Sequence, residues 1–166
     1  MTPRYVCRLA RREELKNVLV SSEYGGAFDF FLKPRFRSHE NFLAEMEDAG
    51  KLCAFCVALD DSGRILGWAC CFKFHERAGY SGVVQLALQV READIGNTVS
   101  ADLYRLCEAE CRRCGVHTIV SFAHSRIPNL IPWHHANDFA ACGYIDLAPS
   151  DRLHVFYRKL AHDQIG

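Results

Sequence analysis

Residues Val83–Cys114, VVQLALQVREADIGNTVSADLYRLCEAECRRC, decide the fold that the rest of the chain must complete. The first eight residues are mostly apolar and partly β-branched, which is typical of a buried strand. After a short connection that contains Gly96, apolar residues recur at helical spacing as far as Cys114. A strand that leads through a tight turn into a helix aims main-chain N–H groups and the helix dipole at an anion. The stretch therefore predicts a site for a ligand that carries phosphate.

Length and composition favour one globular domain that spans residues 1–166. The chain has 20 basic and 20 acidic residues, so it lacks the positive charge of a typical nucleic-acid binder. No apolar run is long enough for a membrane helix, and the first residues lack the apolar core of a signal peptide. We therefore expect a cytoplasmic protein without nucleic-acid or membrane partners.

Nine cysteines raise the question of a zinc site, and two pairs, Cys53/Cys56 and Cys111/Cys114, have the C-x-x-C spacing. Residues three apart on a strand point to opposite faces, so we expect that the first pair cannot chelate one metal ion. The second pair shares a helix face with Cys107, but this is the apolar face that a core would use. Buried reduced thiols and no metal are the prediction, with structural zinc as the alternative.

The rest of the chain alternates between strand and helix patterns. Further strands are predicted at Tyr5–Leu9, Leu52–Leu59, Ile65–Phe74, Val116–Phe122 and Leu153–Leu160, and further helices at about residues 11–22 and 38–49 and in a short segment that ends near Cys142–Tyr144. This order indicates an α/β chain of the α+β type, with a mixed, mainly antiparallel sheet of about six to seven strands and about four helices. The helix between the Val83 and Val116 strands implies that these two strands run parallel.

Three segments resemble the GCN5-related N-acetyltransferase (GNAT) superfamily, and its phosphinothricin-type acetyltransferases in particular. Ser62–Ala69 (SGRILGWA) is similar to the family's hairpin, and Phe74–Tyr80 (FHERAGY) is similar to a connecting segment of the phosphinothricin-type members. Cys142–Tyr144 is similar to the end of the family's last helix. The resemblance extends from Arg8 to Leu160. It implies a single-domain GNAT-like fold, and it also suggests a homodimer.

The resemblance further implies acetyl-CoA as the acyl donor, bound in a V-shaped gap where Val84–Val90 and Thr118–Phe122 separate. The family's pyrophosphate motif, R/Q-x-x-G-x-G/A, falls in a degenerate form on Ile95–Ser100. Main-chain N–H groups build that cradle, so altered side chains are compatible with it. The residues expected to contact the donor are Leu88, Gln89, Val90, Ile95, Gly96, Asn97, Thr98, Val99, Ser100 and Asn129.

The family's general base aligns with Gln85, and its tyrosine, which protonates the leaving thiolate, aligns with Phe139. Neither side chain transfers a proton at neutral pH, so we expect other groups to take part. His75, Glu76 and His135 are the candidates, beside Gln85 itself. For each histidine the alternative is an ordinary surface position, and Tyr80 and His134 are further neighbours.

The resemblance thus predicts an acetyl-CoA-dependent N-acetyltransferase that acts on the primary amine of a small, amino-acid-like molecule. The alternative is a catalytically impaired relative that binds acyl-CoA or another protein. The segment Tyr24–Arg37 is rich in aromatic residues, which either pack beneath a loop or line the substrate site.

Overall fold

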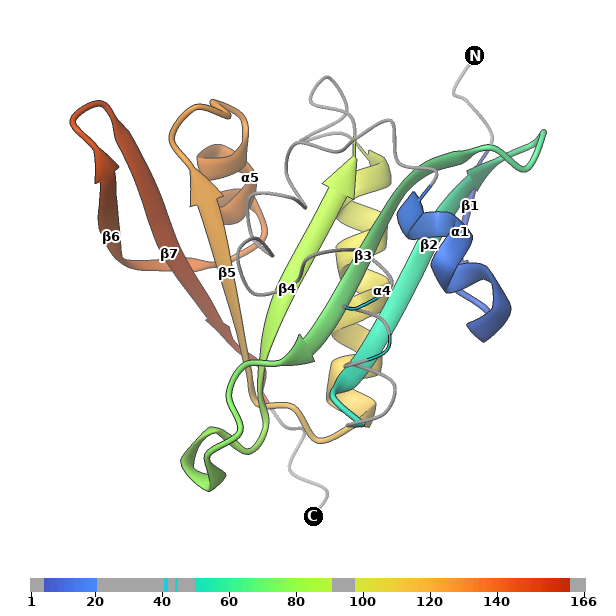
Figure 1. Ribbon diagram of the computed structural model, residues 1–166, viewed down its shortest axis with the longest axis horizontal. Coiled ribbons are helices and arrows are strands. Elements are labelled where there is room, and N and C mark those ends of the chain that lie inside the picture. The colour runs from blue at the N-terminus through green and yellow to red at the C-terminus, as the bar shows by residue number, and fades with distance from the viewer. Residues whose placement is uncertain (1–4, 21–40, 42–43, 45–49, 91–97, 162–166) are drawn as a thin grey trace.

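The computed structural model describes residues 5–20, 41, 44, 50–90 and 98–161. In this part of the chain, a seven-stranded sheet has the order β1-β2-β3-β4-β5-β7-β6 (Figure 1). The strands are β1 (Tyr5–Leu9), β2 (Leu52–Asp60), β3 (Ile65–Lys73), β4 (Val83–Val90), β5 (Thr118–His124), β6 (Ala140–Ala148) and β7 (Asp151–Lys159). The helices are α1 (Leu15–Val20), α4 (Thr98–Arg113) and α5 (Leu130–Ala136), with 3₁₀ turns at Arg12–Glu14 and Ala78–Tyr80.

The pairing pattern confirms the predicted α+β class and the mixed, mainly antiparallel sheet. Strands β2, β3 and β4 form an antiparallel meander, and β4 and β5 are a parallel pair joined by α4. The remaining pairs, β1 with β2 and β7 with both β5 and β6, are antiparallel. The crossover through α4 has to be long because parallel neighbours cannot be joined by a tight turn.

Helices cover both faces of the sheet, with α4 on one face and α1 on the other (Figure 1). Strand residues alternate between the two faces. Leu86 of β4 therefore belongs to the cluster around Leu103 of α4, whereas Ala87 belongs to the cluster around Leu15 of α1 and Trp68 of β3. This alternation matters for the site, because Gln85 and Gln89 lie at odd positions of β4, like Ala87, on the face opposite α4.

The cysteines lie mainly between the sheet and α4. The expectation that Cys53 and Cys56 point to opposite faces of their strand is wrong. A register shift between Leu52 and Ala54 turns Cys53 toward α4, where it contacts the thiols of Cys111 and Cys114. Cys56 faces the same helix, with its Sγ 3.2 Å from Sγ of Cys107. The two thiols of the first C-x-x-C therefore share a face, because a β-bulge breaks the simple alternation.

The structure contains no disulfide between the nine cysteines, all of which are described, and five of them are buried: Cys56, Cys70, Cys71, Cys107 and Cys111. Burial raises the pKa of Cys70, and hydrogen bonds between thiols together with burial raise the pKa of Cys71 and Cys107, so these thiols stay protonated. Among the described residues, no group of three or more His, Cys, Asp or Glu side chains is arranged to hold a metal ion.

The last helix ends earlier than predicted. It stops at Ala136, and Cys142–Tyr144 lies inside the edge strand β6, so the prediction of a helix that ends near these residues is wrong. Asp138 adopts a left-handed conformation, with φ of 61°, and the Asn137 N–H donates to the carbonyl oxygens of Trp133 and His134. These features close the helix as a glycine commonly does.

Some predicted segments fall outside the described residues. They include Tyr24–Arg37, most of the helix predicted at residues 38–49, and Ile95–Asn97 of the phosphate-binding motif. Within the described ranges, every helix is too short or too polar to cross a bilayer.

Candidate active site

Strands β4 and β5 meet at one end and then separate (Figure 1). Three residue pairs join the strands at this end, Val83 with Thr118, Val84 with Ile119, and Gln85 with Val120. We call the last of these pairs the vertex of the gap. Beyond this vertex β5 continues to pair with β7, whereas the described chain offers β4 no partner strand on that side. The predicted V-shaped gap is therefore present. Because main-chain polar groups need hydrogen-bond partners, the free edge of β4 is suited to an extended polar ligand.

A small cavity occupies the gap, with a volume of about 40 Å³. Its lining comes from β4, β5, α5 and the connection between β5 and α5: Leu86, Ala87, Leu88, Val90, Ser121, Phe122, Ile127, Leu130, Trp133 and His134. This volume holds roughly three water-sized groups, about as many heavy atoms as an acetyl group has. The lining is apolar except for Ser121 and the polar atoms of His134 and Trp133, so a polar reaction here would depend on very few side chains.

Ser121 and His134 are hydrogen-bonded to each other in the lining of the cavity. Nε2 of His134 lies 2.8 Å from Oγ of Ser121, and Nδ1 lies 2.7 Å from the carbonyl oxygen of Leu130. A carbonyl oxygen only accepts, so Nδ1 carries the proton and Nε2 accepts the hydrogen bond of the Ser121 hydroxyl. Ser121 is 5% exposed and His134 is 2% exposed. The pair is thus shielded from bulk water.

Aromatic rings hold the imidazole of His134 in place. It stacks on Phe156 at 4.4 Å between ring centroids and meets Trp133 and Phe139 edge-on at 5.0 and 5.2 Å. Burial among these rings lowers the pKa of His134 to about 4, with the neighbouring His135 acting in the same direction. The imidazole is therefore neutral at physiological pH, with its Nε2 lone pair directed at Ser121.

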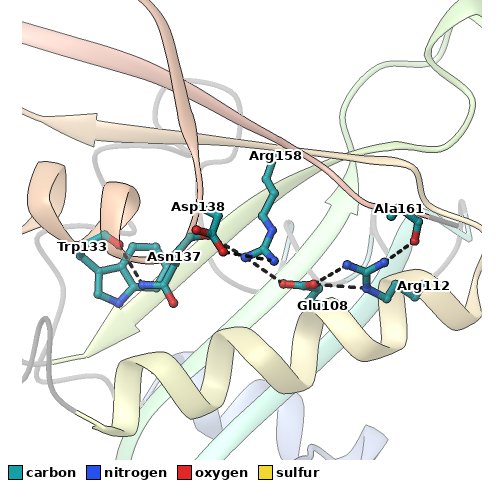
Figure 2. Close-up of polar contacts among 7 residues, drawn as sticks. All are labelled: Glu108, Arg112, Trp133, Asn137, Asp138, Arg158 and Ala161. Carbon is teal, nitrogen blue, oxygen red and sulfur yellow. Dashed lines mark hydrogen bonds and ion pairs between the residues drawn. The ribbon is translucent and has the colours of Figure 1, made fainter. Parts of the chain in front are cut away.

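A polar network fixes the end of α5, which carries His134 (Figure 2). Nη1 of Arg158 on β7 donates to the carbonyl oxygen of Asn137 at 2.6 Å and lies 3.2 Å from Oε2 of Glu108 on α4. Glu108 also pairs with Arg112 at 2.7 Å, and Arg112 donates to the carbonyl oxygen of Ala161. The network ties α4, α5 and β7 together behind the cavity.

Replacing Arg158 with methionine is expected to lower the free energy of unfolding by about 1–2 kcal/mol, because Glu108 and the Asn137 carbonyl would lose a charged donor in a half-buried place. The matched control is Arg152→Met, on the same strand, whose exposed guanidinium pairs with Asp146. We expect that control to stay within about 0.5 kcal/mol. Urea denaturation followed by circular dichroism measures both. Equal effects would show that the network behind α5 contributes no special stability.

The structure distributes the predicted donor-contacting residues around the gap. Leu88 and Val90 line the cavity. Gln89 is 2% exposed, and neither atom of its carboxamide has a hydrogen-bond partner in the described part of the chain. Asn129 is exposed at the start of α5.

The start of α4 holds the rest of that set. Thr98 is exposed at the first position of the helix, and Val99 and Ser100 are buried. Oγ of Ser100 accepts a hydrogen bond of 3.1 Å from Nε1 of Trp133, so this hydroxyl joins α4 to α5. Ile95, Gly96 and Asn97 lie outside the described residues.

The predicted catalytic residues are not gathered in one place. Gln85 lies at the vertex of the gap, on the face opposite α4. His75 and Glu76 are exposed in the connection before β4, where Glu76 pairs with Lys51 at 2.6 Å. His135 is exposed and lies edge-on to Phe156. The cavity lining instead contains Ser121, which the sequence did not single out, and His134, which appeared only as a neighbour of His135.

A pattern in the sequence could have pointed to these two residues. Ser121 is the first residue of β5 past the vertex on the face that carries Ile119, and His134 lies one helical turn after Leu130. Finding them, however, requires knowing where the two strands part, because that point decides which residue of β5 first faces open space.

Comparison by sequence finds no matching family model and no matching curated protein. Comparison by structure finds many similar folds. One is yncA of Salmonella typhimurium, solved with its cofactor acetyl-CoA, with 20% identity, 95% coverage of both chains and a TM-score of 0.75. Another is a phosphinothricin acetyltransferase of Sinorhizobium meliloti in complex with acetyl-CoA, with 18% identity, 98% coverage of this chain, 91% of that one and a TM-score of 0.75.

A third is a GCN5-related N-acetyltransferase of Kribbella flavida, with 19% identity, 94% coverage of this chain, 98% of that one and a TM-score of 0.72. At identities this low, the structural likeness shows a common fold and no more. The chain has the fold of the GNAT superfamily, as the resemblance of its segments predicts.

Proposed function

We propose that the protein is an N-acetyltransferase that transfers the acetyl group of acetyl-CoA to the primary amine of a small, amino-acid-like molecule. Acetyl-CoA is consumed in this reaction, so it is a substrate, and the proposal includes no metal. The observation that carries the proposal is the gap between β4 and β5, where β4 has no partner strand among the described residues and where a small apolar cavity lies. Proteins of the same fold have been solved with acetyl-CoA.

The residues around the gap fit an acyl donor with an extended, amide-containing arm. The free edge of β4 offers main-chain donors and acceptors near Leu88 and Val90, and the cavity has room for a short acyl group. The start of α4 at Thr98 would face the negative phosphates, where the helix dipole is favourable. Residues 95–100 would supply main-chain N–H groups there.

The acceptor would approach from the opposite face, where Gln85 and Gln89 lie four residues apart on β4. A buried amide without partners costs about 1–3 kcal/mol, and a polar acceptor could recover this energy at Gln89. The amine would attack the thioester carbon, with main-chain N–H groups of β4 stabilising the oxyanion. Because Gln85 cannot take up a proton, the amine's proton would leave through ordered water or through His75, Glu76 or His135.

The carboxamide of Gln85 at the vertex favours one alternative, an acyl-CoA-binding or protein-interaction module without transferase activity. This module would keep the gap and lose the chemistry. Gln85, which cannot take up a proton, is the residue that supports this alternative.

The first test is isothermal titration of the protein with acetyl-CoA, followed by a coupled assay of free CoA with a panel of primary amines. We expect saturable binding with one site per chain and amine-dependent release of CoA. Binding without release for any amine would support the alternative. A lack of binding at millimolar acetyl-CoA would contradict both.

Two further parts of the proposal concern assembly and location. We propose a homodimer, and the edge strand β6 supports it, because the side chains of Tyr144, Ile145 and Leu147 are each about half exposed there. A cytoplasmic location likewise remains a prediction.

A further inference from the structure

We propose that Ser121 and His134 form a nucleophile–base pair, and that Ser121 accepts the acetyl group of the donor as an ester before the amine or water receives it. This inference rests on the proposed function for the identity of the donor. It differs from direct transfer in that the protein itself becomes acetylated.

The hydrogen bonds around His134 define the roles of the two residues. Nδ1–H donates to the Leu130 carbonyl at 2.7 Å, which leaves Nε2 as an acceptor 2.8 Å from Oγ of Ser121. A hydroxyl that donates to a neutral imidazole, with the other ring nitrogen held by a fixed acceptor, is the arrangement that activates a serine. Here the fixed acceptor is a main-chain carbonyl at the place where hydrolases use a carboxylate.

The position of the pair matches the place where the acyl group would lie. Ser121 follows Val120, the last residue of β5 that pairs with β4, so its hydroxyl is the first polar side chain inside the gap. Across the gap, Leu86 and Leu88 bring the free edge of β4 to the same cavity. Main-chain N–H groups on that edge are suited to an oxyanion, which a serine ester requires as it forms.

The steps balance without any further reagent. Oγ of Ser121 attacks the thioester carbon, the C–O bond forms, and the hydroxyl proton passes to Nε2 of His134. The C–S bond then breaks, and Nε2 returns the proton to the departing thiolate, which yields free CoA. In the second half, the neutral amine or a water molecule attacks the ester carbon and forms a new C–N or C–O bond. The bond from this carbon to Oγ of Ser121 breaks, and the proton lost by the attacking group passes through Nε2 to Oγ.

The surroundings of His134 determine the rate of acylation and of deacylation. The aromatic rings of Trp133, Phe139 and Phe156 surround the imidazole, and among the described residues the partner of Nδ1 is a main-chain carbonyl and no carboxylate, so the imidazolium formed during proton transfer is poorly stabilised. We therefore expect acylation to be slow compared with that of a complete triad. Slow deacylation by water follows for the same reason, which favours accumulation of the ester.

The test is acetylation of the full-length protein in the absence of any amine. Wild-type protein is incubated with acetyl-CoA and, separately, with p-nitrophenyl acetate, quenched in acid, and analysed by intact mass and peptide mapping. We expect the mass of one acetyl group per chain on Ser121, labile to hydroxylamine. Ser121→Ala should lose at least 90% of the adduct, whereas Ser81→Ala, in an exposed turn, should keep it.

The outcomes separate this inference from the proposed function. Amine-dependent transfer with no adduct from either reagent would overturn the nucleophile and leave the transferase in place. An adduct on Ser121 from p-nitrophenyl acetate, without any binding of acetyl-CoA, would support the pair and contradict the proposed donor. Acetyl groups mapped only to lysines or cysteines, with none on Ser121 of wild-type protein, would overturn the inference even if the Ser121→Ala variant failed to fold.

Discussion

Gln85→Glu is expected to raise kcat/KM for acetyl transfer by on the order of 10²-fold, the lower end of what a positioned general base contributes. The side chain lies at the vertex of the gap, on the face opposite α4, and it is only partly buried. Glutamate has nearly the same shape as glutamine, so the exchange should place a carboxylate there without repacking. A carboxylate in this position can remove the ammonium proton, which the carboxamide cannot.

The pH dependence of the variant provides the sharper readout. The gain should be full at pH 8 and disappear as the pH falls through the pKa of the new carboxyl group, because only the ionised form is a base. Gln85→Leu is the matched control and should bring no gain. If Gln85→Glu binds acetyl-CoA normally, is folded, and still turns over no faster than wild type, the amine's proton does not leave at this vertex.

Much of the fold was predictable because its strands and its main helix carry regular patterns of apolar residues. Val83–Val90 and the following helix formed as expected, and the crossover between them required β4 and β5 to run parallel. The errors arose where one residue overrides a pattern. Asp138 closes α5 in a conformation usually left to glycine, and a bulge near Cys53 reverses the face of that thiol.

The candidate site was less predictable than the fold. The resemblance to a known family predicted the gap and the position of Gln85, because both follow from the order of the strands along the chain. The pairing of Ser121 with His134 depends on side-chain directions on β5 and α5 and on the point where β4 and β5 separate, and this point is known only from the structure. His134 and His135 look alike in sequence, yet the first is buried and the second is exposed.

Gly67→Ala is expected to lower the free energy of unfolding by about 2–3 kcal/mol, a typical cost of overpacking a well-packed core. Gly67 on β3 pairs with Val90 at the open end of β4. A Cβ atom there would lie 2.6 Å from Cγ1 of Val90 and 2.7 Å from the carbonyl oxygen of Gln89. A side chain could turn aside, but a main-chain oxygen of a paired strand cannot, so β3 and β4 would have to separate.

This separation would also reach the gap, because Val90 lines the cavity. We therefore expect Gly67→Ala to weaken acetyl-CoA binding in isothermal titration as well as to lower the urea midpoint. The matched control is Gly79→Ala, whose added Cβ would meet no atom within 4 Å, and it should change the free energy of unfolding by less than about 0.5 kcal/mol. Equal urea midpoints for the two variants would mean that the strands yield easily at this point. In that case the close contact at Gly67 would not be what holds the edge of β4 in position for a donor.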